Sequence, residues 1–183
     1  MANVAAGLKY SFYKNSEGTS IATYGLRYEA PLGAERVLQG KGDGVINPFV
    51  SAATSLGCED QPINLVGYTG FRVPFDDDDS TFYDASFHVD TPVNSWLSPL
   101  FEVNLFQVLD AGNRLPIADE GQDFFNIGSS ESGGETMLTG AAGFRASLTD
   151  DLSWGSAYEF PLVHGEGTRI TAWRITTDFT YKF

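Results

Sequence analysis

Apolar and polar residues alternate with a period of two through most of the chain, in segments of about ten residues separated by turn residues. The segment 169–183 is the clearest case, because its odd positions from Trp173 onward are mainly aromatic or apolar, whereas its even positions include Arg174 and Asp178. This period is typical of a β-strand whose two faces meet different environments. The sequence therefore predicts an all-β fold.

Nine such segments follow one another, so we predict one domain over residues 1–183, an antiparallel up-and-down β-barrel. A composition with 20 Gly and 14 Phe agrees, because Gly suits turns and aromatic side chains suit strands. The long connections, at 31–44 and 110–136, fall at one end of the predicted barrel, and the shortest turns fall at the other. The predicted strands are 8–12, 24–29, 45–56, 63–75, 81–90, 97–109, 138–148, 152–162 and 169–183.

The polar face of these strands combines paired charges with small residues. An enclosed lumen needs both, because Gly and Ala leave room for long side chains that must neutralise one another. The apolar face carries no Arg or Lys in mid-strand, where either would cost about 2 to 4 kcal/mol against lipid. We therefore predict that the apolar face points outward and that the lumen is lined by Lys9, Arg27, Glu29, Arg72, Asp84, His88, Asp90, Glu102, Arg145, Glu159, Arg174, Asp178 and Lys182.

Aromatic residues near the strand ends are typical of membrane-interface girdles, and we assign this role to Trp96, Trp154, Tyr181 and Phe183. The final stretch "ITTDFTYKF", together with the segregated long and short turns, resembles the outer-membrane β-barrel proteins of Gram-negative bacteria. The resemblance implies a bacterial outer-membrane location, contact with outer-membrane lipids, long loops facing outside, and recognition of Phe183 by the barrel-assembly machinery. It implies no catalytic residue and no cofactor.

Nine strands are an odd number, whereas single-chain bacterial barrels have even numbers of strands. We therefore expect at least one strand upstream of residue 1, in agreement with an N-terminal stretch that lacks a signal peptide. Alternatively, "QDFFNIG" at 122–128 forms a tenth strand. No apolar run is long enough for a transmembrane helix. A soluble, lipocalin-like barrel is the alternative to the membrane prediction.

Several residues are candidates for functional sites. A net charge of −13 argues against nucleic acid as a partner, and Cys58 is interpreted as an incidental thiol. His88 has Asp84 and Asp90 on its own face; we interpret the three as lumenal charges, with proton-linked binding or lipid-modifying catalysis as alternatives. The weak candidate for a metal site is Asp76, Asp77, Asp78 and Asp79, which we interpret as a solvated turn. "HGEGT" at 164–168 is predicted to be a hairpin turn.

Three functional hypotheses follow. The first is porin-like passage of small solutes through a narrow charged lumen. The second is a structural or surface-binding barrel with a filled interior and functional outer loops, since small barrels have room mainly for their own side chains. The third is an outer-membrane enzyme that uses His88. We favour a protein that is not an enzyme.

A hairpin-sized motif occurs twice. "YGLRYEAPL" at 24–32 returns as "WGSAYEFPL" at 154–162, and each copy follows a related segment, "AAGLKYS" at 5–11 and "AAGFRAS" at 141–147. We predict that the glycine of each copy leaves lumenal space. The glutamate of each copy, Glu29 or Glu159, is expected to point inward toward a cation such as Arg27 or Arg145.

Overall fold

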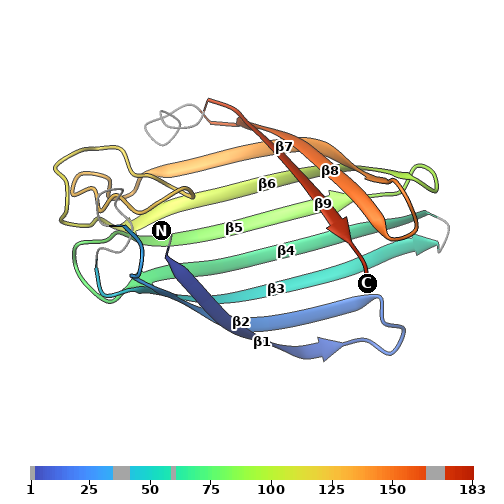
Figure 1. Cartoon of the computed structure of the whole chain (residues 1–183), viewed down its shortest axis with the longest axis horizontal. Coiled ribbons are helices and arrows are strands. Elements are labelled where there is room, and N and C mark those ends of the chain that lie inside the picture. Colours follow the sequence, from blue (N-terminus) through green and yellow to red (C-terminus); the bar gives the residue numbers. More distant parts are fainter. Residues whose placement is uncertain (1–2, 35–41, 59–60, 164–171) are drawn as a thin grey trace.

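The computed structural model describes residues 3–34, 42–58, 61–163 and 172–183. These residues form one antiparallel sheet in which each strand pairs with the next along the chain (Figure 1). The strands are β1 (Val4–Lys14), β2 (Ser20–Ala30), β3 (Val45–Cys58), β4 (Gln61–Pro74), β5 (Thr81–Asp90), β6 (Leu97–Asp110), β7 (Thr136–Ser147), β8 (Leu152–Pro161) and β9 (Arg174–Tyr181). None of the described residues belongs to a helix long and apolar enough to cross a membrane.

The predicted strand order and all-β class are confirmed, and the alternation places the strand bounds within a few residues of those observed. The last strand is shorter than expected, since Trp173 precedes β9 and Phe183 follows it. The suggestion of a tenth strand at 122–128 is wrong: these residues form turns and irregular structure. The predicted "HGEGT" turn, and part of the connection at 31–44, lie outside the described residues.

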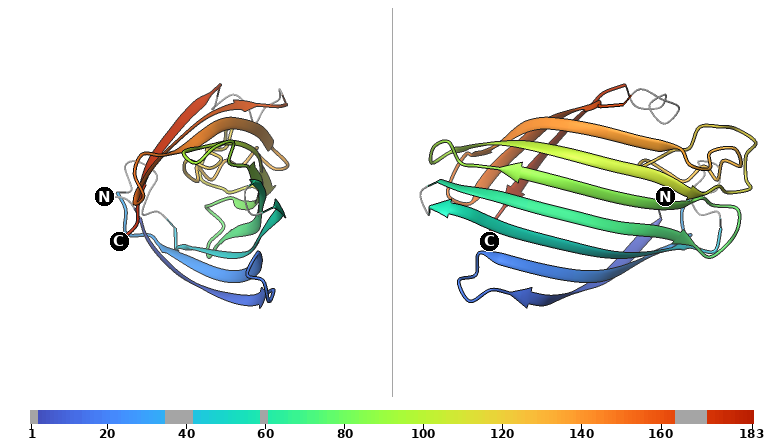
Figure 2. Two further views of the ribbon diagram at one scale, coloured as in Figure 1. Left: turned by 90° about the vertical axis from the view of Figure 1, so that its right-hand side faces the viewer. Right: turned by 180° about the vertical axis from the view of Figure 1, so that it is seen from behind.

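The sheet curls into a deep trough, and in the described residues it does not close into a barrel (Figure 2, left). Strand β1 pairs only with β2, and β9 pairs only with β8. In an antiparallel series of nine strands, the first and the ninth run in the same direction. The antiparallel ladder that joins all other neighbours therefore cannot continue from β9 to β1.

The two faces of the trough differ in composition. Residues paired across neighbouring strands share a face, so Leu8 stands beside Leu26, and Leu26 beside Pro48, on the convex side. On the concave side, Thr23 and Ser51 are opposite one another and share a hydrogen bond of 2.7 Å. The alternation seen in the sequence is thus a separation of an apolar convex face from a polar concave face.

The connection between β6 and β7, residues 111–135, folds back over the long-loop end of the trough, where it is drawn in yellow and orange in Figure 1. Beneath it lies a small apolar cluster that the sequence did not predict, formed by Phe82, Phe106, Val108 and Met137. These side chains stand near the long-loop ends of β5, β6 and β7. The concave face is therefore apolar under the loop and charged further along the trough.

Candidate functional site

A cavity of about 470 Å³ lies on the concave face. Its walls come from strands β4 to β9 and from Asp123 of the β6–β7 connection. Arg27 and Glu29 line a smaller cavity of about 30 Å³ instead. Lys9 and Lys182 line neither of the two. The predicted lumenal residues that meet in the large cavity are Arg72, Asp84, His88, Asp90, Glu102, Arg145, Glu159, Arg174 and Asp178.

The ion pairs of β8 and β9 follow the strand register. Glu159 is directly opposite Arg174, whose guanidinium group binds it and also reaches Asp123 in the loop. Arg145 is opposite Gly155, and it extends across this glycine to Asp178, with Nη1–Oδ1 and Nη2–Oδ2 distances of 3.0 and 3.1 Å. The expectation that Glu159 pairs with Arg145 is therefore wrong, because the register offers each a closer partner.

In the first copy of the repeated motif, the expected pairing is present. Arg27 Nη2 lies 3.7 Å from Glu29 Oε2, and both side chains are partly exposed. The prediction that the repeated glycines leave space for other side chains is confirmed for the concave face of the trough. A Cβ atom at Gly25 would collide with the ring of Phe49, and one at Gly155 would lie 2.6 Å from Asp178 Oδ2. One glycine thus admits an aromatic ring, and the other admits an ion pair.

His88 lies between two carboxylates. Its Nδ1 is 2.7 Å from Glu102 Oε1, and its Nε2 is 2.9 Å from Asp90 Oδ2. Glu102 was not among its predicted neighbours; it is the residue opposite His88 on β6. The predicted neighbour Asp84 instead lies 3.7 Å from Arg72. Because carboxylates engage both ring nitrogens, the arrangement suits charge pairing better than a base that activates a nucleophile.

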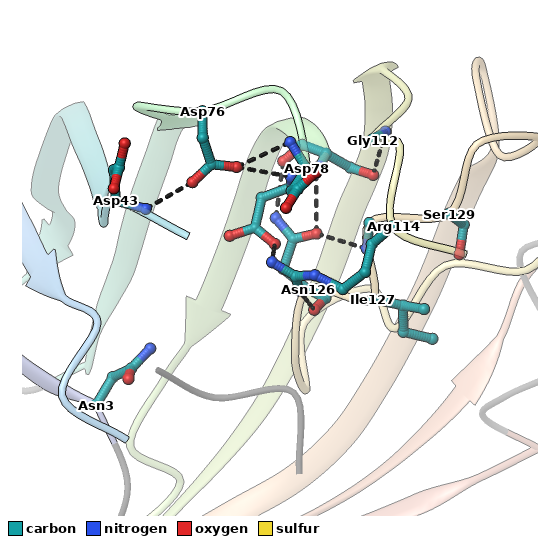
Figure 3. Close-up of polar contacts among 12 residues, drawn as sticks. Asn3, Asp43, Asp76, Asp78, Gly112, Arg114, Asn126, Ile127 and Ser129 are labelled. Atoms are coloured by element: carbon teal, nitrogen blue, oxygen red, sulfur yellow. Dashed lines mark hydrogen bonds and ion pairs between the residues drawn. The ribbon is translucent and has the colours of Figure 1, made fainter. Parts of the chain in front are cut away.

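Of the four consecutive aspartates at 76–79, Asp76 organises the turn between β4 and β5 (Figure 3), whereas the side chains of Asp77 and Asp78 are exposed. Asp76 accepts hydrogen bonds from the backbone N–H groups of Asp78 and Asp79, at 2.8 and 3.1 Å, and from that of Asp43 at 2.6 Å. Within the described residues, no group of three or more His, Cys, Asp or Glu side chains is placed to hold a metal ion. The prediction of a solvated turn is wrong for Asp79, which is buried.

Asp79 is buried in an ion pair with Arg114, 2.6 Å away, from the β6–β7 connection. Burial raises the pKa of Asp79 to about 6, while Arg114 acts in the opposite direction. The raised value indicates that desolvation outweighs the attraction of the guanidinium group. This pair joins the turn after β4 to the long connection.

A buried glutamate, Glu120, holds the β6–β7 connection in place. It is 0% exposed and accepts hydrogen bonds from Ser80 Oγ at 2.7 Å, and from the backbone N–H groups of Gly121, Ile127 and Ser129. The nearby Glu135 accepts the N–H of Glu120 at 2.8 Å, and burial raises the pKa of Glu135. Sequence reasoning missed this cluster, because nothing local distinguishes Glu120 from the exposed acidic residues around it.

The four predicted interface aromatics lie at the short-turn end of the sheet. Trp96 is in the β5–β6 turn, Trp154 is near the start of β8, and Tyr181 ends β9 shortly before Phe183. Trp96, Tyr181 and Phe183 are exposed. Trp154 is half-buried, and it packs edge-on against Phe144 with ring centroids 5.0 Å apart.

Cys58 is a free, exposed cysteine at the end of β3.

No protein-family model matches the chain, and no curated protein matches its sequence. The two faces of the sheet and the cavity are therefore the features that bear on function.

Proposed function

We propose that the chain is an outer-membrane β-barrel protein whose convex face contacts lipid and whose charged concave face forms a narrow passage for small solutes. The observation that supports this proposal is the inverted distribution of side chains. The apolar face is exposed over the whole sheet, while the ionised residues gather on the enclosed side.

The exposed apolar face is too extensive for an ordinary soluble monomer, which rarely shows apolar patches of more than a few hundred Å². Leu8 is 85% exposed, Phe179 68% and Ile175 61%, and each stands on the convex side of its strand. A soluble sheet buries such a face against a second layer. In the described residues no helix or second sheet covers it, and lipid is the environment that suits it best.

Aromatic residues at both ends of the strands support a membrane interface. At the short-turn end stand the predicted girdle residues, including Trp96 and Tyr181. At the long-loop end, Tyr28 packs against Phe75, and Tyr158 stacks on Trp173 at a centroid distance of 6.3 Å. Two aromatic belts flanking an apolar band are typical of barrels in lipid. We further propose that the barrel-assembly machinery recognises β9 together with Phe183.

The interior fits a constricted passage. Side chains that reach the cavity are held by ion pairs between strands, and the β6–β7 connection narrows the long-loop end through Asp123 and the ring of Phe124, which lies 5.3 Å from the Arg174 guanidinium carbon. A cavity of about 470 Å³ suits small polar solutes.

The membrane part of the proposal is tested by refolding the chain into detergent and lipid vesicles. We expect gel mobility that changes on boiling, β-type circular dichroism, and resistance of the vesicle-bound strands to protease. A protein that stays monomeric and soluble without detergent would contradict the proposal and favour a soluble barrel.

The passage is tested separately, by single-channel recording in planar bilayers. We expect discrete conductance steps that change in Arg145→Ala, because this substitution removes the guanidinium group that holds Asp178 beside the cavity. A correctly inserted barrel that carries no current would contradict passage without contradicting the membrane location.

The packed long-loop end favours a second candidate, a surface-binding barrel with a filled interior. The buried Glu120 cluster and the apolar cluster beneath the β6–β7 connection fill this end, as expected where the loop is the functional element. Deletion of residues 111–135 separates the two functions. A binding barrel loses cell-surface or ligand binding, whereas a porin-like barrel gains conductance.

A further inference from the structure

We propose that the cavity selects small cations over anions, an inference that rests on the proposed passage and specifies what passes. The charged side chains around the cavity are unequal in number. Three guanidinium groups and one imidazole, from Arg72, Arg145, Arg174 and His88, face six carboxylates. These belong to Asp84, Asp90, Glu102, Asp123, Glu159 and Asp178. The lining keeps an excess of negative charge even when His88 is protonated.

The excess lies in two clusters, one near the long-loop ends of β8 and β9 and the other near the short-turn ends of β5 and β6. At the long-loop end, the single guanidinium group of Arg174 is shared by Glu159 and Asp123. At the short-turn end, the imidazole of His88 is shared by Asp90 and Glu102. In each cluster two carboxylates share one basic side chain, so each cluster retains negative potential that a mobile cation relieves.

The remaining charges come in matched pairs, Arg145 with Asp178 near the short-turn ends of β7 and β9, and Arg72 with Asp84 near the long-loop ends of β4 and β5. Arg145 and Asp178 form two parallel hydrogen bonds, a geometry that holds the guanidinium group against its carboxylate and away from a passing anion. Arg72 is held more loosely, with Nε 3.7 Å from Asp84 Oδ1. Asp84 is 9% exposed, and its Oδ1 accepts no hydrogen bond from the described residues. No part of the described lining offers an unpaired arginine to an anion.

Among the described residues, the mouth at the long-loop end also carries an excess of negative charge. Exposed carboxylates stand there in the described connections and strand ends, whereas Arg114 is buried in its pair with Asp79. An acidic rim concentrates cations and depletes anions before either reaches the cavity. The exposed acidic residues are Asp43, Asp77, Asp78, Asp110 and Glu131.

The inference is tested by the reversal potential of the chain in neutral-lipid planar bilayers under a KCl gradient. We expect a K⁺ to Cl⁻ permeability ratio above unity. Glu102→Gln with Asp123→Asn removes one of the two sharing carboxylates in each cluster, and should lower the ratio about twofold or more. Glu17→Gln with Asp150→Asn is the matched control: both carboxylates are exposed in short turns and neither lines the cavity, so the ratio should stay close to wild type.

A ratio at or below unity, or one that the cavity variant leaves unchanged, overturns the inference while the conductance itself still supports the passage. Glu102→Gln alone serves if the double variant fails to fold. If the barrel carries no current, the passage is contradicted. Selectivity is then tested by the melting temperature in detergent, measured with either 1,4-diaminobutane or succinate added. A larger stabilisation by the diamine, reduced in Glu102→Gln, supports cation binding; equal shifts overturn it.

Discussion

Two glycines on the concave face of the second repeated hairpin, Gly143 in β7 and Gly155 in β8, make room for different groups. A Cβ atom at Gly143 would collide with the backbone carbonyl of Ser156 and lie 2.7 Å from Ala157 Cα, so this glycine permits close approach of strands β7 and β8. At Gly155 the nearest atoms are the ends of two side chains, Asp178 and Arg145, which can turn away. Gly143 therefore allows two strands to pack closely, whereas Gly155 leaves room for the ion pair that lines the cavity.

This difference predicts unequal costs for the two alanine substitutions. Gly143→Ala should lower the free energy of unfolding by about 2 kcal/mol or more, because backbone must shift, and Gly155→Ala by about 1 kcal/mol or less. Urea titration of the refolded protein in vesicles measures both. Equal losses, or a greater loss for Gly155→Ala, would show that the ion pair matters more to stability than strand packing.

The ion pair between Asp79 and Arg114 predicts a pH dependence of stability. The pKa of Asp79 is raised to about 6, so the folded protein binds this proton more tightly than the unfolded chain, and the contribution of Asp79 to stability falls as pH rises from about 4 to 6. Asp79→Asn mimics the protonated side chain. Its stability relative to wild type should therefore increase with pH across this range, as measured by urea titration at several pH values.

Asp77→Asn is the control, because it removes the charge of a carboxylate in the same turn that is exposed to solvent rather than buried. A relative stability of Asp79→Asn that falls as pH rises would mean that attraction to Arg114 outweighs desolvation.

At the scale of elements, the two related hairpins share one register. Ala5 is opposite Glu29 in β1 and β2, and Ala141 is opposite Glu159 in β7 and β8. The hairpins nevertheless end up in different settings, because β1 is an edge strand, whereas β7 pairs on both sides. Glu29 is consequently part-exposed and pairs within its own strand, while Glu159 is buried and bound by β9.

The β6–β7 connection is an element in its own right, held by Glu120 rather than by regular secondary structure. Glu120→Gln keeps the size but replaces an acceptor oxygen with an amide group facing N–H and O–H donors, at a local cost of about 2 kcal/mol. Hydrogen exchange at Ile127 and Ser129 should accelerate about tenfold or more, while the strand amides stay protected. Glu131→Gln, exposed in the same connection, should leave the exchange rates unchanged.

Unchanged exchange in Glu120→Gln would indicate that the Asp79–Arg114 pair and the apolar cluster hold the connection without this carboxylate. Faster exchange in the strands as well would indicate that the connection stabilises the whole sheet.

At the scale of the molecule, the inverted arrangement of faces predicts opposite responses at neighbouring residues of β6. Val103 stands on the convex face and Asn104 on the concave face, where Asn104 Nδ2 lies 3.5 Å from Glu159. Val103→Arg should lower the free energy of unfolding in vesicles by about 2 to 4 kcal/mol, whereas Asn104→Arg should change this free energy by less than about 1 kcal/mol. Equal effects, or a greater effect at Asn104, would contradict a lipid-facing convex side.

The sequence by itself determined the strands and their two faces. Alternation is a local property, because each residue is selected for the environment on its own side of the strand; hence Leu8 and Phe179 were predicted to lie on the outer face and Asp84 and Glu102 on the inner one. The order of strands followed equally, since short turns force neighbours in sequence to pair.

Only the tertiary structure decided which charges meet, how the long connection folds, and whether the sheet closes. The partners of His88 and Glu159 depend on the register between strands, which alternation does not specify. Glu120 is distinguished by its burial and by contacts that reach as far as Ser80, forty positions away in the chain. Closure depends on the directions of β1 and β9, which become neighbours only when the whole sheet has curled. Each of these depends on residues distant in sequence, so a local pattern carries no record of them.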